Sequence, residues 1–125
     1  MKGTPEQIIK GARESLGAAE LMHRNKMYEV AVSRAYFSMF YVASALLKKD
    51  GLDFDTHSGV HSAFGRVFAK RGRLPKDTQR WLLDAFIYKC AADYDLYYDM
   101  TADISAEVIG NTEMFVRVGE EMISG

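Results

Sequence analysis

The sequence predicts an all-α protein, an up-down four-helix bundle core with one additional short helix. Apolar residues recur at helical spacing in five segments, and no stretch alternates apolar and polar residues as a half-buried strand would. The two prolines, Pro5 and Pro75, both stand where a helix can begin. A length of 125 residues suits one helical domain covering residues 1–125, and five helices with short connections are typical of a bundle.

The overall charge excludes a protein that binds nucleic acid through its net charge alone. The formal net charge is −1 and the pI is about 6.3, so any RNA or nucleotide binding must be local. Cys90 is the only cysteine and cannot form an intramolecular disulfide. The start, MKGTPEQ, has no apolar run, and the longest apolar stretch, Ala35 to Leu47, is shorter than the about 20 residues of a membrane span. We therefore expect a cytoplasmic protein.

The first predicted helix begins at Thr4-Pro5-Glu6-Gln7 and runs to about Arg24. Threonine is a good N-cap, proline suits the first helical position, and glutamine three residues after the cap can complete a capping box. Six apolar residues follow at helical spacing: Ile8, Ile9, Ala12, Leu16, Ala19 and Met22.

The second predicted helix, from Met27 to Lys49, contains no glycine or proline and ends at Asp50-Gly51. On a helical wheel its apolar residues point in nearly every direction, which is typical of a central, buried helix. They are Val30, Ala31, Ala35, Phe37, Met39, Phe40, Val42, Leu46 and Leu47. The few polar residues on such a helix are therefore informative.

Three further helices complete the bundle. Thr56 can cap the third, which ends at Arg71-Gly72-Arg73; Leu74-Pro75 opens the fourth; and Thr101 can cap the last, with Asp103 and Glu107 near its positive end. We expect their apolar faces to contain, in turn, Val60, Ala63, Phe64, Val67 and Phe68; Trp81, Leu82, Ala85, Phe86, Ala92 and Tyr94; and Ala106, Val108, Ile109, Met114, Phe115, Val118 and Met122.

A polar seam runs along the second helix. Arg34, Ser38 and Tyr41 are spaced four and then three residues apart, so they lie within about 40° of one another on the helix. A buried arginine is costly unless it has a carboxylate partner, a groove or a ligand phosphate. Arg34 is therefore either a paired core residue or an anion-binding residue, and Tyr41 is either an amphipathic core residue or part of the same site.

The residues around this seam resemble a known family. The segment Ser33 to Tyr41 (SRAYFSMFY) is similar to the central-helix signature of stand-alone prokaryotic HEPN (higher eukaryotes and prokaryotes nucleotide-binding) proteins. The likeness continues in order and spacing through residues 56–60, 64–65, 74–75 and 91–95 and an acidic last helix. It covers roughly residues 4 to 122.

The resemblance implies a specific chemistry. HEPN ribonucleases pair an arginine with a histidine four to six intervening residues further along one helix, and they dimerise so that both pairs face one cleft. The arginine binds phosphate and the histidine transfers a proton, with no metal or cofactor because RNA supplies its own 2′-hydroxyl. Arg34 matches the arginine, but Tyr41 occupies the histidine position.

This substitution favours binding over cleavage. An unperturbed tyrosine titrates near 10, so its deprotonation at pH 7 costs about 4 kcal/mol, against almost nothing for histidine. A tyrosine can still donate a hydrogen bond to phosphate or stack on a base. We therefore expect a HEPN-type homodimer that binds RNA or a nucleotide between subunits, and the resemblance implies a toxin–antitoxin component with a minimal nucleotidyltransferase partner. The alternatives are a metal-independent ribonuclease with an Arg…Tyr motif and a protein-interaction module.

The end of the fourth helix is the second candidate region. By resemblance, the region of Lys89, Asp93, Tyr94, Tyr97 and Tyr98 helps to form the cleft that faces the central helix. Asp93 is a candidate ion-pair partner for Lys89 or Arg34. The alternative is a helix end held by its own salt bridges.

Two histidines and a basic segment remain. His57 and His61 have a spacing that can place two imidazoles on one metal ion, but a third ligand is missing locally, so we expect no metal site and a capping or core role for His57. The only basic concentration, which either follows a phosphate backbone or forms a solvated edge, comprises Arg66, Lys70, Arg71, Arg73, Lys76 and Arg80.

Overall fold

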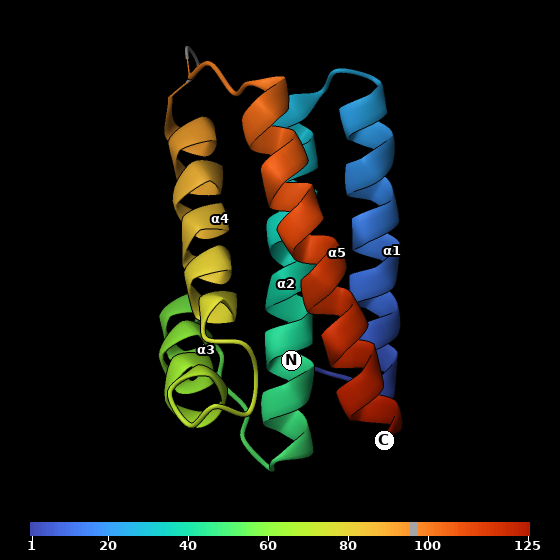
Figure 1. Ribbon diagram of the computed structural model, residues 1–125, viewed down its shortest axis with the longest axis vertical. Coiled ribbons are helices and arrows are strands. Elements are labelled where there is room, and N and C mark those ends of the chain that lie inside the picture. Colours follow the sequence, from blue (N-terminus) through green and yellow to red (C-terminus); the bar gives the residue numbers. More distant parts are fainter. Residues whose placement is uncertain (96–97) are drawn as a thin grey trace.

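The computed structural model describes residues 1–95 and 98–125, so Tyr97 lies outside the described residues. In the described part the chain forms α1 (Pro5–Arg24), α2 (Tyr28–Lys49), α3 (His57–Phe64), the π-helical turn η1 (Gly65–Ala69), α4 (Asp77–Tyr94) and α5 (Ala102–Ser124). The four long helices run alternately up and down, and α3 lies at one end of the bundle, below α4 and beside α2 (Figure 1). The all-α bundle predicted from the sequence is confirmed.

Three threonines cap the helices as expected. Thr4 Oγ1 accepts from the Gln7 amide at 3.1 Å, while Gln7 Oε1 accepts from the Thr4 amide at 2.9 Å, which is a complete capping box. Thr56 and Thr101 accept in the same way from the third residue after each of them, at 3.0 and 3.1 Å. These bonds satisfy backbone N–H groups that a helix start leaves free.

The apolar α2 is the centre of the bundle. It packs against α1, α4 and α5, and Tyr36, Met39, Leu46 and Leu47 are almost completely buried on it. By length and composition alone, α2 could span a membrane, and its apolar run is longer than the sequence suggested. Most of that run is buried inside the bundle, as expected for the core helix of a helical domain.

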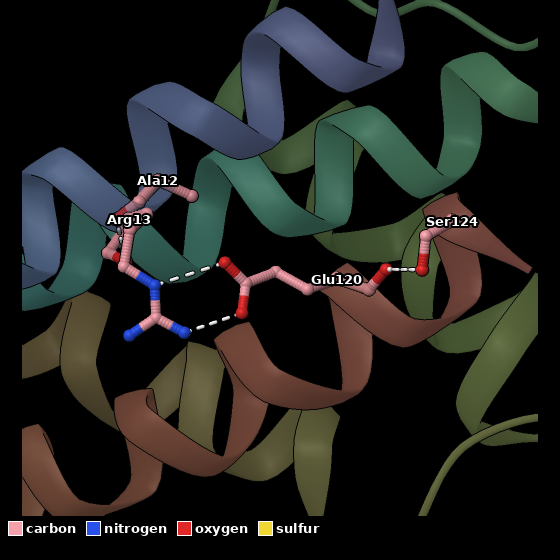
Figure 2. A network of polar contacts seen from close by, with 5 residues as sticks. Ala12, Arg13, Glu120 and Ser124 are labelled. Atoms are coloured by element: carbon pink, nitrogen blue, oxygen red, sulfur yellow. Dashed lines mark hydrogen bonds and ion pairs between the residues drawn. The ribbon is translucent and has the colours of Figure 1, made fainter.

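The outer helices α1 and α5 are linked by an ion pair at the surface, and below it α5 packs closely against α2. Arg13 donates to both carboxylate oxygens of Glu120, from Nε at 3.0 Å and from Nη2 at 2.5 Å (Figure 2). Beside Glu120, the buried Gly119 lets α5 approach closely, because a Cβ there would collide with Val42 Cγ1 of α2. A glycine at this contact is therefore a packing requirement.

Some details differ from the sequence prediction. Val67 and Phe68 lie in the π-helical turn rather than in an α-helix, and this wider turn lets two adjacent side chains both enter the core. Four residues expected on apolar faces are exposed instead, namely Val30 near the start of α2, Tyr94 at the end of α4, and Ala106 and Met114 on the outer side of α5. Helical periodicity does not show where a helix extends past its neighbours.

Candidate functional site

Arg34 lies on α2 with its guanidinium at the surface of a groove. The side chain is half-buried, and it forms no ion pair within the described residues. Its guanidinium carbon lies 4.9 Å from the centroid of the Phe37 ring, a cation–π contact. In the described part of the chain only Ser44 Oγ is buried without a hydrogen-bond partner, so the unpaired Arg34 donors reach solvent. The paired-core interpretation of Arg34 is therefore wrong.

The groove is a cavity of about 680 Å³ between α1 and α2. Arg34 and Tyr41 line it from α2, and it carries the charges of Lys2, Arg34 and Glu14. The remaining lining comes from α1 and the residues before it: Met1, Gly3, Gln7, Ile8, Gly11, Ser15 and Ala18. Small side chains on α1 thus leave Arg34 accessible.

Tyr41 shares this groove with Arg34. Its ring lies 6.1 Å from that of Phe37, and its hydroxyl, which is not buried, has no hydrogen-bond partner among residues 1–95 and 98–125. The phenol can therefore donate to a ligand that Arg34 contacts.

Ser38 does not belong to this site, which corrects the predicted polar seam. It is completely buried, and its hydroxyl donates to the carbonyl of Ala12 on α1 at 2.7 Å. Ser15 of α1 donates in return to the carbonyl of Arg34 at 2.7 Å. A buried hydroxyl needs a partner, and here the α1 backbone provides it. Ser38 therefore fixes the two helices together.

Phe37, which the sequence interpretation assigned to the core, contacts Arg34 and Tyr41. Two cations lie near its half-buried ring: Arg34 Cζ is 4.9 Å and Lys89 Nζ of α4 is 5.3 Å from the ring centroid. Because Phe37 follows Arg34 by three residues and precedes Tyr41 by four, helical spacing could have placed all three on one side of α2. We call Arg34, Phe37 and Tyr41 the α2 face.

The end of α4 contributes one residue to this surface. Lys89 pairs with Asp93 at 2.5 Å, so the predicted ion pair is confirmed for Lys89 and not for Arg34. Tyr94 is 89% exposed and has no ring or cation contact with the α2 face in the described structure. Tyr98 is partly buried against the core. The structure thus brings Lys89 and its partner Asp93 to the site, whereas Tyr94 faces solvent.

A polar network lies beside the α2 face. The hydroxyl of the buried Tyr36 lies 2.5 Å from His57 Nδ1 and 2.8 Å from His61 Nε2. Burial raises the pKa of Tyr36, and the nearby Cys90 raises it further. Burial, followed by the proximity of His57, lowers the pKa of His61 to about 4. The pKa of His57 is lowered by burial and then by the charge of Lys89.

This arrangement changes the interpretation of His57 and His61. Two of their ring nitrogens face a phenol, and within the described residues no three His, Cys, Asp or Glu side chains gather to hold a metal ion. Thr56 rather than His57 caps α3. The i, i+4 spacing that suggested two metal ligands instead places both histidines on one tyrosine.

Five of the six residues of the basic segment divide into two groups, and the sixth, Arg71, is exposed. Arg73 pairs with Asp50 at 2.6 Å and Arg80 with Asp77 at 3.7 Å. A second cavity of about 490 Å³ is lined by Arg66, Lys70 and Lys76 with Gly65, Ala69 and Gln79. These three cations have no ion pair among the described residues, and phosphate binding by them stays a prediction.

Comparison with known proteins gives a consistent result. The sequence model of a family described as the HEPN domain matches residues 5–122. A UPF0332 protein of Gloeobacter violaceus is 35% identical over 124 residues, which are 97% of this chain and 98% of that protein. Two proteins of Methanocaldococcus jannaschii, named "Putative toxin MJ0142" and "Putative toxin MJ0605", are 32% and 35% identical; each match covers 89% of this chain and 76% and 82% of the relatives.

Proposed function

This chain belongs to the HEPN domain family, and we propose that it binds RNA or a nucleotide as a cytoplasmic homodimer and acts in a toxin–antitoxin pair. The observation that carries the proposal is the state of Arg34. It is an arginine on the central helix of the core, without a carboxylate partner in the described structure, open to a cavity of about 680 Å³. Because its unpaired donors reach solvent, such an arginine is well placed to bind a phosphate through two hydrogen bonds.

The neighbours of Arg34 fit a nucleotide unit. Lys89, which pairs with Asp93, adds a second cation near the Phe37 ring, and Tyr41 offers a hydroxyl donor. Phe37 offers a partly exposed ring on which a base can stack. The α2 face with Lys89 therefore supplies charge, hydrogen bonding and stacking to one ligand.

A second copy of the chain would complete the site. Met27 and Val30, at the start of α2, are 47% and 41% exposed. Val30 precedes Arg34 by four residues and so lies on the same side of the helix. Burial of these side chains against a second α2 would place two α2 faces around one cleft, so that one RNA strand meets both arginines.

The toxin role is supported by the names of the two archaeal relatives. A toxin needs a partner that restrains it, and we propose a minimal nucleotidyltransferase in that role, as the family resemblance implies. A gene for such an enzyme beside the gene for this chain would support the pairing. A pure interaction module would need the partner but not an open Arg34.

The binding proposal is tested with a labelled single-stranded RNA and fluorescence anisotropy in the presence of EDTA. Arg34→Ala should weaken RNA binding at least about tenfold, because it removes a charge-assisted contact worth about 1.5–3 kcal/mol. Arg117→Ala is the matched control, since this exposed arginine lies on α5, away from the groove. Equal losses in both variants, or RNA binding by Arg34→Ala at wild-type affinity, would contradict the proposal.

A further inference from the structure

The Tyr36–His57–His61 network has no role in phosphate binding as proposed, although it lies beside the α2 face. We propose that His57, positioned by Tyr36, is the catalytic proton-transfer residue of a metal-independent ribonuclease site that also contains Arg34 and Lys89. This inference rests on the proposed function, because it requires RNA to bind at the α2 face. It assigns to α3 the chemistry that Tyr41 cannot supply.

His57 lies close enough to the proposed phosphate ligands to act on the same nucleotide. Residues from three helices surround the Phe37 ring. The distance from the centroid of this ring is 6.1 Å to the centroid of the His57 ring, 4.9 Å to Arg34 Cζ and 5.3 Å to Lys89 Nζ. The charge of Lys89 also acts on His57, where it lowers the pKa of the imidazole. A phosphate held by the two cations would therefore bring its ribose towards His57.

The second ring nitrogen of His57 is free for such a reaction. Nδ1 is occupied by Tyr36, whereas Nε2 has no hydrogen-bond partner among the residues that the structure describes. Nε2 is not among the buried atoms without a partner in the described part of the chain, so it is accessible to solvent. The rings of Phe40, at 4.6 Å, and Phe86, at 5.5 Å, pack against the imidazole and restrict its rotation. The accessible nitrogen is thus held in a defined position.

The Tyr36 hydroxyl sets the tautomer of His57. A phenol has one proton, so it donates to one histidine and accepts from the other. His61, whose pKa is about 4, is neutral at pH 7 and can accept the Tyr36 proton at Nε2. Tyr36 then accepts from His57 Nδ1–H at 2.5 Å, which leaves a lone pair on Nε2. In this arrangement His57 is a base.

The same hydrogen bonds serve the protonated state. When Nε2 takes up a proton, His57 Nδ1–H continues to donate to Tyr36, and Tyr36 continues to donate to His61. Because burial raises the pKa of Tyr36, the phenol keeps its own proton at neutral pH. Tyr36 is therefore a positioning residue, comparable to the group that orients the histidine of a catalytic triad.

The proposed reaction balances without a metal or cofactor. The ribose 2′-hydroxyl loses its proton to His57 Nε2, and its oxygen forms a bond to the adjacent phosphorus. The bond from phosphorus to the 5′-oxygen breaks, and that oxygen takes a proton from water. The resulting hydroxide is neutralised by the proton that His57 releases, so the products are a 2′,3′-cyclic phosphate and a 5′-hydroxyl. Arg34 and Lys89 stabilise the charge on the phosphate oxygens.

The charged and titratable groups around His57 determine the pH dependence. They are Tyr36 from α2, His61 from α3 and Lys89 from α4, with Cys90 acting on Tyr36. A base must be unprotonated, and burial with Lys89 lowers the pKa of His57 below its ordinary value of 6.5. The cleavage rate should therefore be fully developed at pH 7 and fall only below pH 6.5.

The test measures RNA cleavage and RNA affinity on the same variants. The full-length protein is incubated in EDTA, between about pH 5 and pH 8, with a labelled single-stranded RNA. Its 2′-O-methyl counterpart, which lacks the nucleophile, gives the background. His57→Gln should lower the cleavage rate at least about 100-fold with RNA affinity unchanged. Added imidazole should restore cleavage in His57→Ala, which a purely structural role of His57 would not allow. His23→Gln is the control for histidine loss.

Tyr36→Phe separates positioning from folding. It should lower the rate and move the acid limb of the pH profile to lower pH, because the imidazolium loses its acceptor, while RNA affinity is retained. Wild-type protein that binds RNA but does not cleave it in EDTA would overturn the proton-transfer proposal and leave the binding proposal intact. Cleavage by His57→Gln at the wild-type rate would do the same. No binding of RNA by the wild type would overturn both.

Discussion

At the scale of single residues, the Tyr36 hydroxyl contacts two histidine side chains at once. It lies in a ring-rich environment, 2.5 and 2.8 Å from two imidazoles, and its own residue is completely buried. A buried polar network stabilises the fold only when each of its polar atoms has a hydrogen-bond partner. Tyr36→Phe should therefore cost some stability in addition to its effect on His57, and its fold must be checked beside its activity.

The low pKa of His61 predicts a stability that depends on pH. The unfolded chain takes up a proton near 6.5, whereas the folded chain resists it until about pH 4. The contribution is fully present above pH 6.5 and is lost as the pH falls towards 4, up to about 3 kcal/mol in total. In urea unfolding followed by circular dichroism, His61→Gln should therefore show a weaker fall of stability over this range than the wild type.

The comparison of slopes isolates His61. His61→Gln is expected to be less stable than the wild type at pH 7, since Tyr36 loses its second partner. The two free energies of unfolding should approach each other as the pH falls. Parallel curves for the two proteins would mean that burial of His61 does not affect its titration.

At the scale of the helices, the close packing of α5 against α1 and α2 depends on one of two glycines. A Cβ on Gly119 would collide with Val42 Cγ1 and lie 3.3 Å from Ile9 Cδ1, whereas a Cβ on Gly110, on the same helix, would meet nothing within 4 Å. Gly110→Ala should raise the free energy of unfolding by up to about 1 kcal/mol through helix propensity. Gly119→Ala should lower it by about 1–3 kcal/mol through overpacking. Thermal unfolding of both variants checks this difference, and changes of the same sign would contradict it.

The helices were predictable because their signals are local. Thr4 with Gln7 specifies a capping box within four residues, and the apolar wheel of α2 specifies a central helix without any knowledge of its neighbours. The π-helical turn η1 was not predictable in the same way. It depends on how Val67 and Phe68 enter a core formed by distant segments.

The site was predictable in its central pair and not in its surroundings. Arg34 and Tyr41 lie on the same helix, and their spacing along it places both side chains in one groove. Ser38 has the same helical spacing, but its hydroxyl lies in the core, where it donates a hydrogen bond to a backbone carbonyl of α1. Phe37 was assigned to the core and His57 to a cap or the core, because neither side chain carries a local sign of what faces it in the fold. Only the placement of α3 and α4 shows that Lys89 and His57 approach Phe37.

At the scale of the whole molecule, the net charge of −1 gives no general attraction to RNA. Affinity for RNA must come from a few local cations. One copy of the chain supplies two of them, Arg34 and Lys89, which lie near the Phe37 ring. A dimer with facing α2 helices would present about four to one strand. For single strands the logarithm of the binding constant falls with the logarithm of the salt concentration by about 0.7 per phosphate contact. The proposed dimer should thus have a slope of about −3, and a monomer about half of that.

A neutral change at the proposed interface tests this link between assembly and binding. Met27→Gln with Val30→Gln makes the start of α2 polar without altering any charge, and it should shift the dimer towards monomer in sedimentation equilibrium. As the dimer dissociates, the slope of the logarithm of the RNA-binding constant against the logarithm of the salt concentration, measured by fluorescence anisotropy, should fall to about half. Ile87→Gln is the matched control, because this side chain is 63% exposed on α4 and outside the α2 face. If the double variant stays dimeric, or becomes monomeric with the wild-type slope, the RNA site does not lie between two α2 helices. The electrostatics of one copy would then account for all of the binding.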